Sequence, residues 1–168
     1  MLTMVSTRFS NTTLGENRTY CYKTGIKGCI YGSPFEMSPN ILYDSLVFVI
    51  EMNNDANQIE GIGLIRNLPF IDKYYPIYME GNYNRFVYKS EYHISRELLL
   101  RNNHILVIVL DYLLFKEKNH MKRGCGFTTI TQKIINGKTN PKYKLLDINK
   151  ISQAIKDCFN IVYDKAVN

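Results

Sequence analysis

The sequence predicts an α+β domain, for three reasons. Ser45–Met52 and Ile59–Arg66 are apolar runs rich in β-branched residues, as core strands are. Ser95 and Asp147 each precede residues at helical spacing, as helix N-caps do. The 168 residues are 45% hydrophobic and 21% charged, with no repeat or linker. We therefore expect a single domain over residues 1–168.

The N-terminal quarter of the chain predicts short strands and turns. Leu2–Ser10 alternates loosely as a strand, Asn11–Asn17 reads as a turn, and Arg18–Thr24 alternates well enough for a second strand. Glycines and prolines interrupt residues 25–39, which predicts a long loop with at most one short strand at Cys29–Tyr31.

A hairpin is expected next. The polar turn Asn53–Asn57 joins the two apolar runs of residues 45–52 and 59–66. Gly61 and Gly63 fall on one face of the second strand, where the missing side chains allow another element or a ligand to approach closely.

The middle of the chain contains one ambiguous element. A connection rich in Tyr and Pro (residues 69–80) leads to an alternating strand at Tyr83–Ile94, and Ser95 begins a short helix that ends near Arg101. The run Ile105–Phe115 is apolar on all sides, so its periodicity does not separate strand from helix. Its β-branched residues favour a buried central strand, with a helix as the alternative.

The C-terminal third predicts a strand, a polar turn and an amphipathic helix. Phe127–Ile135 alternates weakly as a strand, and Gly137–Lys144 is polar. Asp147 then begins a helix with an apolar stripe at Ile148, Ile151, Ile155, Phe159 and Val162.

Positive charge is concentrated in one segment. Between Lys116 and Lys144, eight Lys/Arg and one acidic residue give +7, whereas thirteen Lys/Arg and fourteen acidic residues elsewhere give −1. Such a local basic surface usually contacts phosphates or acidic proteins.

The segment Lys116–Thr131, which we call the basic loop, combines this charge with flexible backbone and hydroxyl groups, as an anion-binding loop requires. Its candidate nucleic-acid-binding residues are Lys116, Lys118, His120, Lys122, Arg123, Gly124, Gly126 and Thr128. Basic and aromatic residues also interleave on the expected strand surfaces. Further candidates there are Arg66, Asn67, Arg85 and Lys89 for phosphates, and Tyr88 for base stacking.

Composition argues against several other classes of protein. The N-terminus lacks a signal-peptide pattern, and Ile105–Phe115 is too short to cross a bilayer, so an intracellular protein is expected, in cytoplasm or nucleus, with no membrane partner. The four cysteines form no C-x-x-C pair, which indicates free thiols and predicts no metal or cofactor.

No catalytic residue is assigned, and a non-enzymatic role is favoured. Glu51, Asp55 and Glu60 form the only dense acidic group, and they lack the following E-x-K expected of a metal-dependent nuclease. His93 and His120 are the residue types of a general acid/base pair, but no motif supports that role.

The order of elements resembles the PUA-like superfamily, in particular its YTH and EVE domains. The similar stretches are SLVFVIEMNNDANQIEGIGLIRN, ILVIVLDYLLFKEKNHMKRGCGFTTIT and INKISQAIKDCF, and they span about residues 45–160. The resemblance implies a small twisted β-barrel flanked by helices that binds RNA or DNA and holds a flipped or modified base in an aromatic pocket. YTH domains build their methyl-adenine cage with tryptophans, and this chain contains no Trp. The resemblance therefore implies that Tyr74, Tyr75 or Tyr78 takes their place for base stacking, and no spacing rule selects among the three.

A nucleic-acid-binding module is the function expected from these patterns. The alternative is a structural or interaction protein without base selectivity, such as a virion or genome-packaging component, which would favour a homodimer. Ile, Asn, Lys and Tyr are abundant, and their codons are rich in A and T. This bias and the general character of the sequence point to a large DNA virus.

Overall fold

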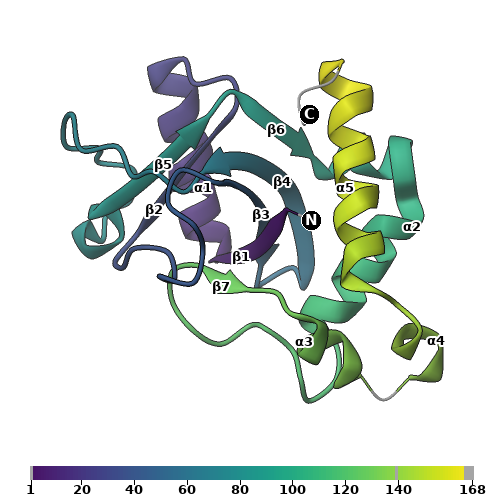
Figure 1. Ribbon diagram of the computed structural model, residues 1–168. Helices are drawn as coiled ribbons and strands as arrows, with labels where there is room; N and C mark the ends of the chain where they lie inside the picture. The colour runs from purple at the N-terminus through teal and green to yellow at the C-terminus, as the bar shows by residue number, and fades with distance from the viewer. Residues whose placement is uncertain (1, 139, 165–168) are drawn as a thin grey trace.

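The computed structural model describes residues 2–138 and 140–164, and it has an α+β fold (Figure 1). A mixed five-stranded sheet has the order β6-β4-β3-β1-β7, and β2 and β5 form a separate antiparallel pair. In the larger sheet, β1 and β3 are parallel neighbours and the other pairs are antiparallel. The strands are β1 (Thr3–Phe9), β2 (Cys29–Ser33), β3 (Leu46–Asn53), β4 (Gln58–Arg66), β5 (Phe86–Ser90), β6 (Tyr92–Ser95) and β7 (Thr128–Thr129).

Helices cover the sheet unequally. Figure 1 shows α2 and α5 side by side on one side of the five-stranded sheet, with β2, β5 and α1 on the other. The helical elements are α1 (Asn11–Thr24), η1 (Gly81–Asn84, a 3-10 helix), α2 (Arg96–Phe115), α3 (Gln132–Asn136), α4 (Pro141–Lys144) and α5 (Ile148–Tyr163).

Strand β3 is buried on both faces because successive side chains enter two different cores. Phe48 and Ile50 belong to the core beneath α2 and α5, where the Phe48 ring stacks on Phe159 with 5.4 Å between centroids. Val47 and Val49 belong to the core beneath β2 and β5. This double burial explains why the sequence of β3 is apolar almost throughout.

The hairpin, the N-terminal strand and the C-terminal helix are confirmed. Strands β3 and β4 pair antiparallel as expected. Asp147 accepts a hydrogen bond from the backbone N–H of Asn149 (2.7 Å), and Ile151, Ile155 and Phe159 of α5 are buried.

The turn predicted at 11–17 and the strand predicted at 18–24 are wrong, because both lie in helix α1. Ser10 and Thr13 form a capping box at its start, and Gly25 ends it with a left-handed φ of 71°. The helix buries only Asn17 and Cys21, so it lacks the apolar stripe that reveals most helices.

The buried strand predicted at 105–115 is also wrong, and the helical alternative is correct. These residues continue the short helix predicted from Ser95, and the two parts form α2 with a break at Asn103. Leu106, Leu110 and Leu113 face the core, whereas Ile105 and Ile108 are exposed. Ile105 and Ile108 were among the β-branched residues that favoured a buried strand, yet both lie outside the core.

Two further predictions need correction. The single strand predicted at 83–94 is divided among η1, β5 and β6, and β5 and β6 belong to different sheets. The strand predicted at 127–135 contains only the two residues of β7 before α3 begins, and the polar turn at 137–144 contains α4.

Helix α2 is long and apolar enough to span a bilayer by length and composition alone. Core helices of soluble proteins meet the same criterion, and one face of α2 packs against the sheet and α5.

Candidate nucleic-acid interface

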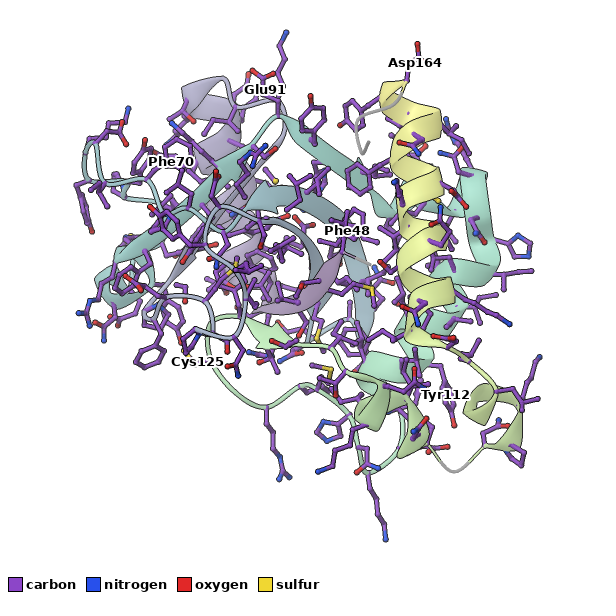
Figure 2. The ribbon with its side chains drawn as sticks, in the orientation of Figure 1. Phe48, Phe70, Glu91, Tyr112, Cys125 and Asp164 are labelled. Carbon is purple, nitrogen blue, oxygen red and sulfur yellow. The ribbon has the colours of Figure 1, made fainter. Side chains whose placement is uncertain are left out.

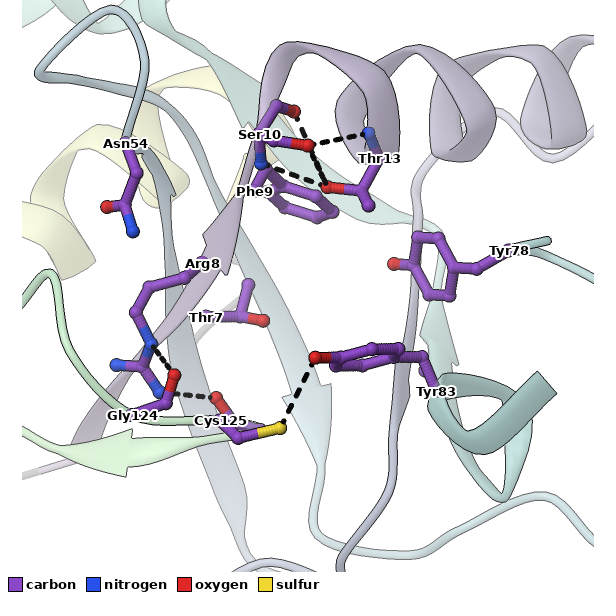
Figure 3. Close-up of a pocket in the computed structure, with 12 residues that line it drawn as sticks. Thr7, Arg8, Phe9, Ser10, Thr13, Asn54, Tyr78, Tyr83, Gly124 and Cys125 are labelled. Atoms are coloured by element: carbon purple, nitrogen blue, oxygen red, sulfur yellow. Dashed lines mark hydrogen bonds between the residues drawn. The ribbon is translucent and has the colours of Figure 1, made fainter. Parts of the chain in front are cut away.

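A cavity of about 260 Å³ opens where the end of β1, the start of α1, η1 and the basic loop meet (Figure 3). We call it the pocket. Its lining residues are Thr7, Arg8, Phe9, Ser10, Thr13, Gly32, Asn54, Tyr78, Tyr83, Gly124, Cys125 and Gly126.

Aromatic rings form one wall of the pocket. Tyr78 is buried, and its hydroxyl accepts a hydrogen bond from Asn17 Nδ2 (3.1 Å); burial raises the pKa of Tyr78. Tyr83 on η1 packs edge-on against Tyr78 with 6.3 Å between centroids and is 38% exposed. Its hydroxyl lies 3.6 Å from Cys125 Sγ across the pocket, and this contact raises the pKa of Tyr83. The Tyr78 ring is therefore fixed in place, and the Tyr83 ring is accessible to a ligand.

Arg8 organises the opposite wall. Its Nε donates to the carbonyl of Gly124 (3.1 Å), and its Nη2 donates to the carbonyl of Gly126 and to Thr128 Oγ1 (2.9 Å each). Burial lowers the pKa of this guanidinium, which still stays charged at neutral pH. Arg8 thus attaches the basic loop to β1 in addition to the backbone pairing of β7 with β1.

Both glycines of this wall have conformations that other residues rarely adopt. Gly124 has φ 108° and Gly126 has φ 67°. A Cβ on Gly126 would also lie 2.6 Å from Ser33 Oγ. The G-C-G sequence therefore allows a tight turn beside the pocket.

The first turn of α1 adds a positive dipole end to the rim of the pocket. Ser10 and Thr13 line the cavity, and the Ser10 hydroxyl accepts from the backbone N–H of Thr13 (3.1 Å). The N–H of Asn11 donates to Asp55 Oδ2 (2.7 Å), so part of this positive end is already compensated.

The predicted cations of the basic loop have unequal access to solvent. Lys116, Lys118 and Arg123 are exposed, whereas His120 and Lys122 are half-buried. Lys122 Nζ donates to Asn57 Oδ1 (2.7 Å), which attaches the loop to the β3–β4 turn. The exposed three are the residues available to an anion.

Lys138 also contributes to the +7 charge counted between Lys116 and Lys144, but its amine is not at the surface. Its side chain is 0% exposed, and Nζ donates to the carbonyls of Lys116 and Asn119 (3.0 Å each). Burial lowers the pKa of this amine. Part of the +7 charge found in the sequence therefore supports the conformation of the loop.

The predicted stacking tyrosines occupy different environments. Tyr78 lines the pocket and Tyr74 is exposed, whereas Tyr75 and Tyr88 are buried. The Tyr88 hydroxyl accepts from the backbone N–H of Met37 (3.2 Å), and its ring lies in the core. Neither buried ring presents a free face to a base.

The secondary set of phosphate candidates lies outside the pocket. Asn67 is buried and donates to the carbonyl of Ile41 (2.9 Å), and Arg66 donates to the carbonyl of Asp44 (2.9 Å). Arg85 is exposed, and Lys89 lies over the Phe70 ring, 4.4 Å from its centroid.

Sequence reasoning missed Arg8, Phe9, Tyr83 and Cys125. Phe9 looked like one more residue of an N-terminal strand, and Cys125 was read only as a free thiol. The signal for the pocket was the unusual G-C-G turn, but its partners come from distant parts of the chain.

The acidic residues considered for catalysis are held in structural interactions. Glu51 is 0% exposed and accepts from Arg18 Nη2 (2.5 Å) and Tyr31 Oη (2.8 Å), with His93 Nε2 at 3.1 Å. Burial alone would raise the pKa of Glu51, but His93 and Arg18 outweigh it and lower that pKa to about 2.

The remaining members of the proposed catalytic sets lie in other networks. Glu60 Oε1 accepts from Asn53 Nδ2 (2.8 Å), and His120 Nδ1 accepts from the backbone N–H of Lys122 (3.3 Å). Within residues 2–138 and 140–164, no group of three or more His, Cys, Asp or Glu residues is arranged to bind a metal ion.

No family model, curated protein or solved structure matches this chain.

Proposed function

We propose that this protein binds nucleic acid by placing one base in the pocket and the adjoining phosphates along the basic loop. One observation carries the proposal: Gly124–Gly126 forms a wall of the pocket and also belongs to the basic loop. The segment that carries the exposed cations therefore also closes one side of a hollow whose other wall is aromatic. Nucleotides combine a planar apolar ring with a negative phosphate, which is the chemistry that this pairing fits.

The size of the pocket supports a single base. About 260 Å³ lies just below the ~300–1,000 Å³ of typical small-molecule sites. Tyr83 offers an accessible ring for contact, while Phe9 and Tyr78 provide buried apolar surface.

Lys116, Lys118 and Arg123 supply the charge for the phosphates. They are exposed, so each can neutralise a phosphate and release counterions. The start of α1 at the pocket rim favours an anion in the same place.

A PUA-like architecture is part of this proposal. Its support is the packing of the β2–β5 pair over one face of the five-stranded sheet, with α2 and α5 covering the other face. Both RNA and DNA fit the chemistry of the pocket.

The first experiment measures binding of labelled single- and double-stranded RNA and DNA by fluorescence anisotropy at about 50 and 200 mM salt. The test variant is Lys118→Ala/Arg123→Ala, which avoids the structural Lys122. The matched control is Lys23→Ala/Lys150→Ala, which removes two exposed lysines from α1 and α5. The slope of the logarithm of the binding constant against the logarithm of salt concentration measures how many phosphates are neutralised. We expect the test variant, and not the control, to reduce the magnitude of this slope by roughly 1.4–1.8.

Cys125 provides a direct probe of the pocket. It is exposed, whereas Cys21, Cys29 and Cys158 are buried, so alkylation under native conditions reports on this thiol. A base in the pocket should slow its alkylation. Tyr83→Ala should remove this protection, and Tyr83→Phe, which retains the ring, should preserve it.

Two outcomes would overturn the proposal. The first is no binding of any nucleic acid at low salt. The second is binding without protection of Cys125 and without an effect of Tyr83→Ala, which would indicate nonspecific electrostatic contact, as expected of a packaging or interaction protein.

A further inference from the structure

We propose that a groove beside the pocket binds the nucleotides that flank the pocket base, and that the ligand is therefore single-stranded. The groove is formed by Phe70, Lys73, Tyr74, Arg85 and Phe86, and we call it the flanking groove. This inference rests on the proposed function and extends it to a class of nucleic acid and a path across the surface.

The flanking groove is an open hollow of about 470 Å³ between residues 70–74 and the start of β5. Tyr74 is 66% exposed and Phe70 is 38% exposed, so both rings have faces in contact with solvent. Two of its lining side chains are cationic, and its described lining includes no carboxylate. Asp72 lies in the same segment, but its carboxylate accepts from the Tyr75 hydroxyl (2.8 and 3.1 Å).

Cations lie against aromatic rings in and beside the flanking groove, and of these rings Tyr75 is buried. Arg85 lies over the Phe86 ring at 5.8 Å from its centroid, and Lys73 lies over the Tyr75 ring at 5.2 Å. Lys89 lies between Phe70 and Tyr75, at 4.4 and 5.0 Å from the two centroids. Surfaces that bind single strands combine stacking rings with positive charge in this way.

The pocket and the flanking groove share a wall. Tyr83 lines the pocket, and the next residues of the chain, Asn84 and Arg85, line the flanking groove. Figure 2 places Cys125 of the pocket and Phe70 of the groove on the side of the molecule away from α5. A strand that leaves the pocket would reach the groove by passing over η1, whose N-cap is Glu80.

Asn84 fixes this shared wall. It is buried, and its Nδ2 donates to the Tyr74 hydroxyl (3.2 Å) and to the carbonyl of Tyr78 (2.8 Å). Its Oδ1 accepts from the backbone N–H of Tyr78 (3.0 Å). One side chain thus positions an exposed ring of the groove relative to a buried ring of the pocket.

Single-stranded ligands fit this arrangement better than duplexes. Tyr74 and Phe70 can stack only on bases whose faces are free, and base pairing hides those faces. An acidic protein segment would use the cations but would leave the exposed rings without planar partners.

The test compares oligonucleotides of increasing length, from a dinucleotide to about eight nucleotides, within the range bound by single-strand sites. We expect the longer oligonucleotide to bind roughly 5- to 100-fold more tightly than the dinucleotide. Tyr74→Ala and Lys73→Ala/Arg85→Ala should each reduce that gain. The Lys23→Ala/Lys150→Ala control should not.

Protection of Cys125 separates this inference from the proposed function. In the groove variants, the dinucleotide should protect Cys125 from alkylation as it does in the original protein. If length brings no gain and these variants bind normally while Cys125 is still protected, the flanking groove is refuted and the pocket stands. If no nucleotide protects Cys125, both proposals fail. Tighter binding of duplex than of single strand would overturn the assignment to single strands.

Discussion

At the scale of single residues, Glu51 connects four elements of the structure through its carboxylate. Its carboxylate joins Arg18 of α1, Tyr31 of β2 and His93 of β6 to strand β3. A buried carboxylate with several donors is stable only while all of them are present. Glu51 is therefore a structural centre and not a free acid.

Glu51→Gln should destabilise the fold by about 3 kcal/mol at neutral pH, near the lower end for breaking a buried pair because Arg18 remains partly exposed. The folded protein lowers the pKa of Glu51 from 4.5 to about 2. The stabilisation by the carboxylate is thus present above about pH 4.5 and is lost as the pH falls toward 2.

Urea unfolding at neutral pH and at about pH 3 checks this prediction. The difference in free energy of unfolding between the original protein and Glu51→Gln should shrink at the lower pH. Glu97→Gln is the control, because the Glu97–Arg101 pair is exposed and should contribute at most about 0.5 kcal/mol. An equal difference at both pH values would contradict the role of the carboxylate charge.

Residue roles of this kind were only partly predictable. The charge of the basic loop and the flexible backbone at Gly124 and Gly126 follow from local composition, whereas the positive φ values there are seen only in the structure. The role of Arg8 does not, because its partners in the basic loop lie more than 110 positions away in the chain. An arginine in a strand carries no local sign that it will organise a distant loop.

At the scale of elements, α2 is two helical segments joined at Asn103. This residue has φ −157° and ψ 79°, which are not helical values, and its Oδ1 accepts from the backbone N–H of Leu106 (3.0 Å). Asn103 therefore acts as an N-cap inside the element, and the second segment carries most of its buried residues.

Asn103→Ala should lower the free energy of unfolding by about 1 kcal/mol, because alanine cannot accept that hydrogen bond. Asn102→Ala is the neighbouring control; Asn102 is exposed, so we expect a change within about 0.5 kcal/mol. Thermal and urea unfolding of the two variants measure the difference. Increased stability of Asn103→Ala would instead mean that the break strains a helix that prefers to be continuous.

The same helix shows what limits prediction of elements. Ile105–Phe115 is apolar at almost every position, so neither a period of 2 nor one of 3.6 stands out. Helix α1 was missed for the opposite reason, since its sequence is polar and its signals are the caps at Ser10 and Gly25. The β3–β4 hairpin and α5 were predicted because pattern, turn and cap agree there.

At the scale of the whole molecule, the five-stranded sheet separates two cores, and the pocket lies on the side of the β2–β5 pair. Phe9 and Tyr78 belong to that core and also line the pocket, and Gly32 of β2 lies beside them in the lining. The position of the pocket therefore depends on how closely β2 packs over β4. The sequence indicated a close approach at Gly61 and Gly63, but it did not identify the approaching element.

Gly63→Ala should separate these two layers. A Cβ at Gly63 would lie 2.3 Å from the Tyr31 hydroxyl and 2.7 Å from Cys29 Sγ. Tyr31 is fully buried and donates to Glu51, so it cannot move without breaking that bond. We expect a loss of about 1–3 kcal/mol in the free energy of unfolding.

Gly15→Ala is the matched control for this change. Gly15 is exposed within α1, and nothing lies within 4 Å of its added Cβ. Alanine there should stabilise the protein by up to about 1 kcal/mol through its higher helix propensity. In urea unfolding, the change in free energy of unfolding should therefore be negative for Gly63→Ala and positive for Gly15→Ala. Gly63→Ala should also make Cys29 reactive toward alkylation. Equal effects at the two positions, with Cys29 still protected, would show that β2 does not pack against β4 in this way.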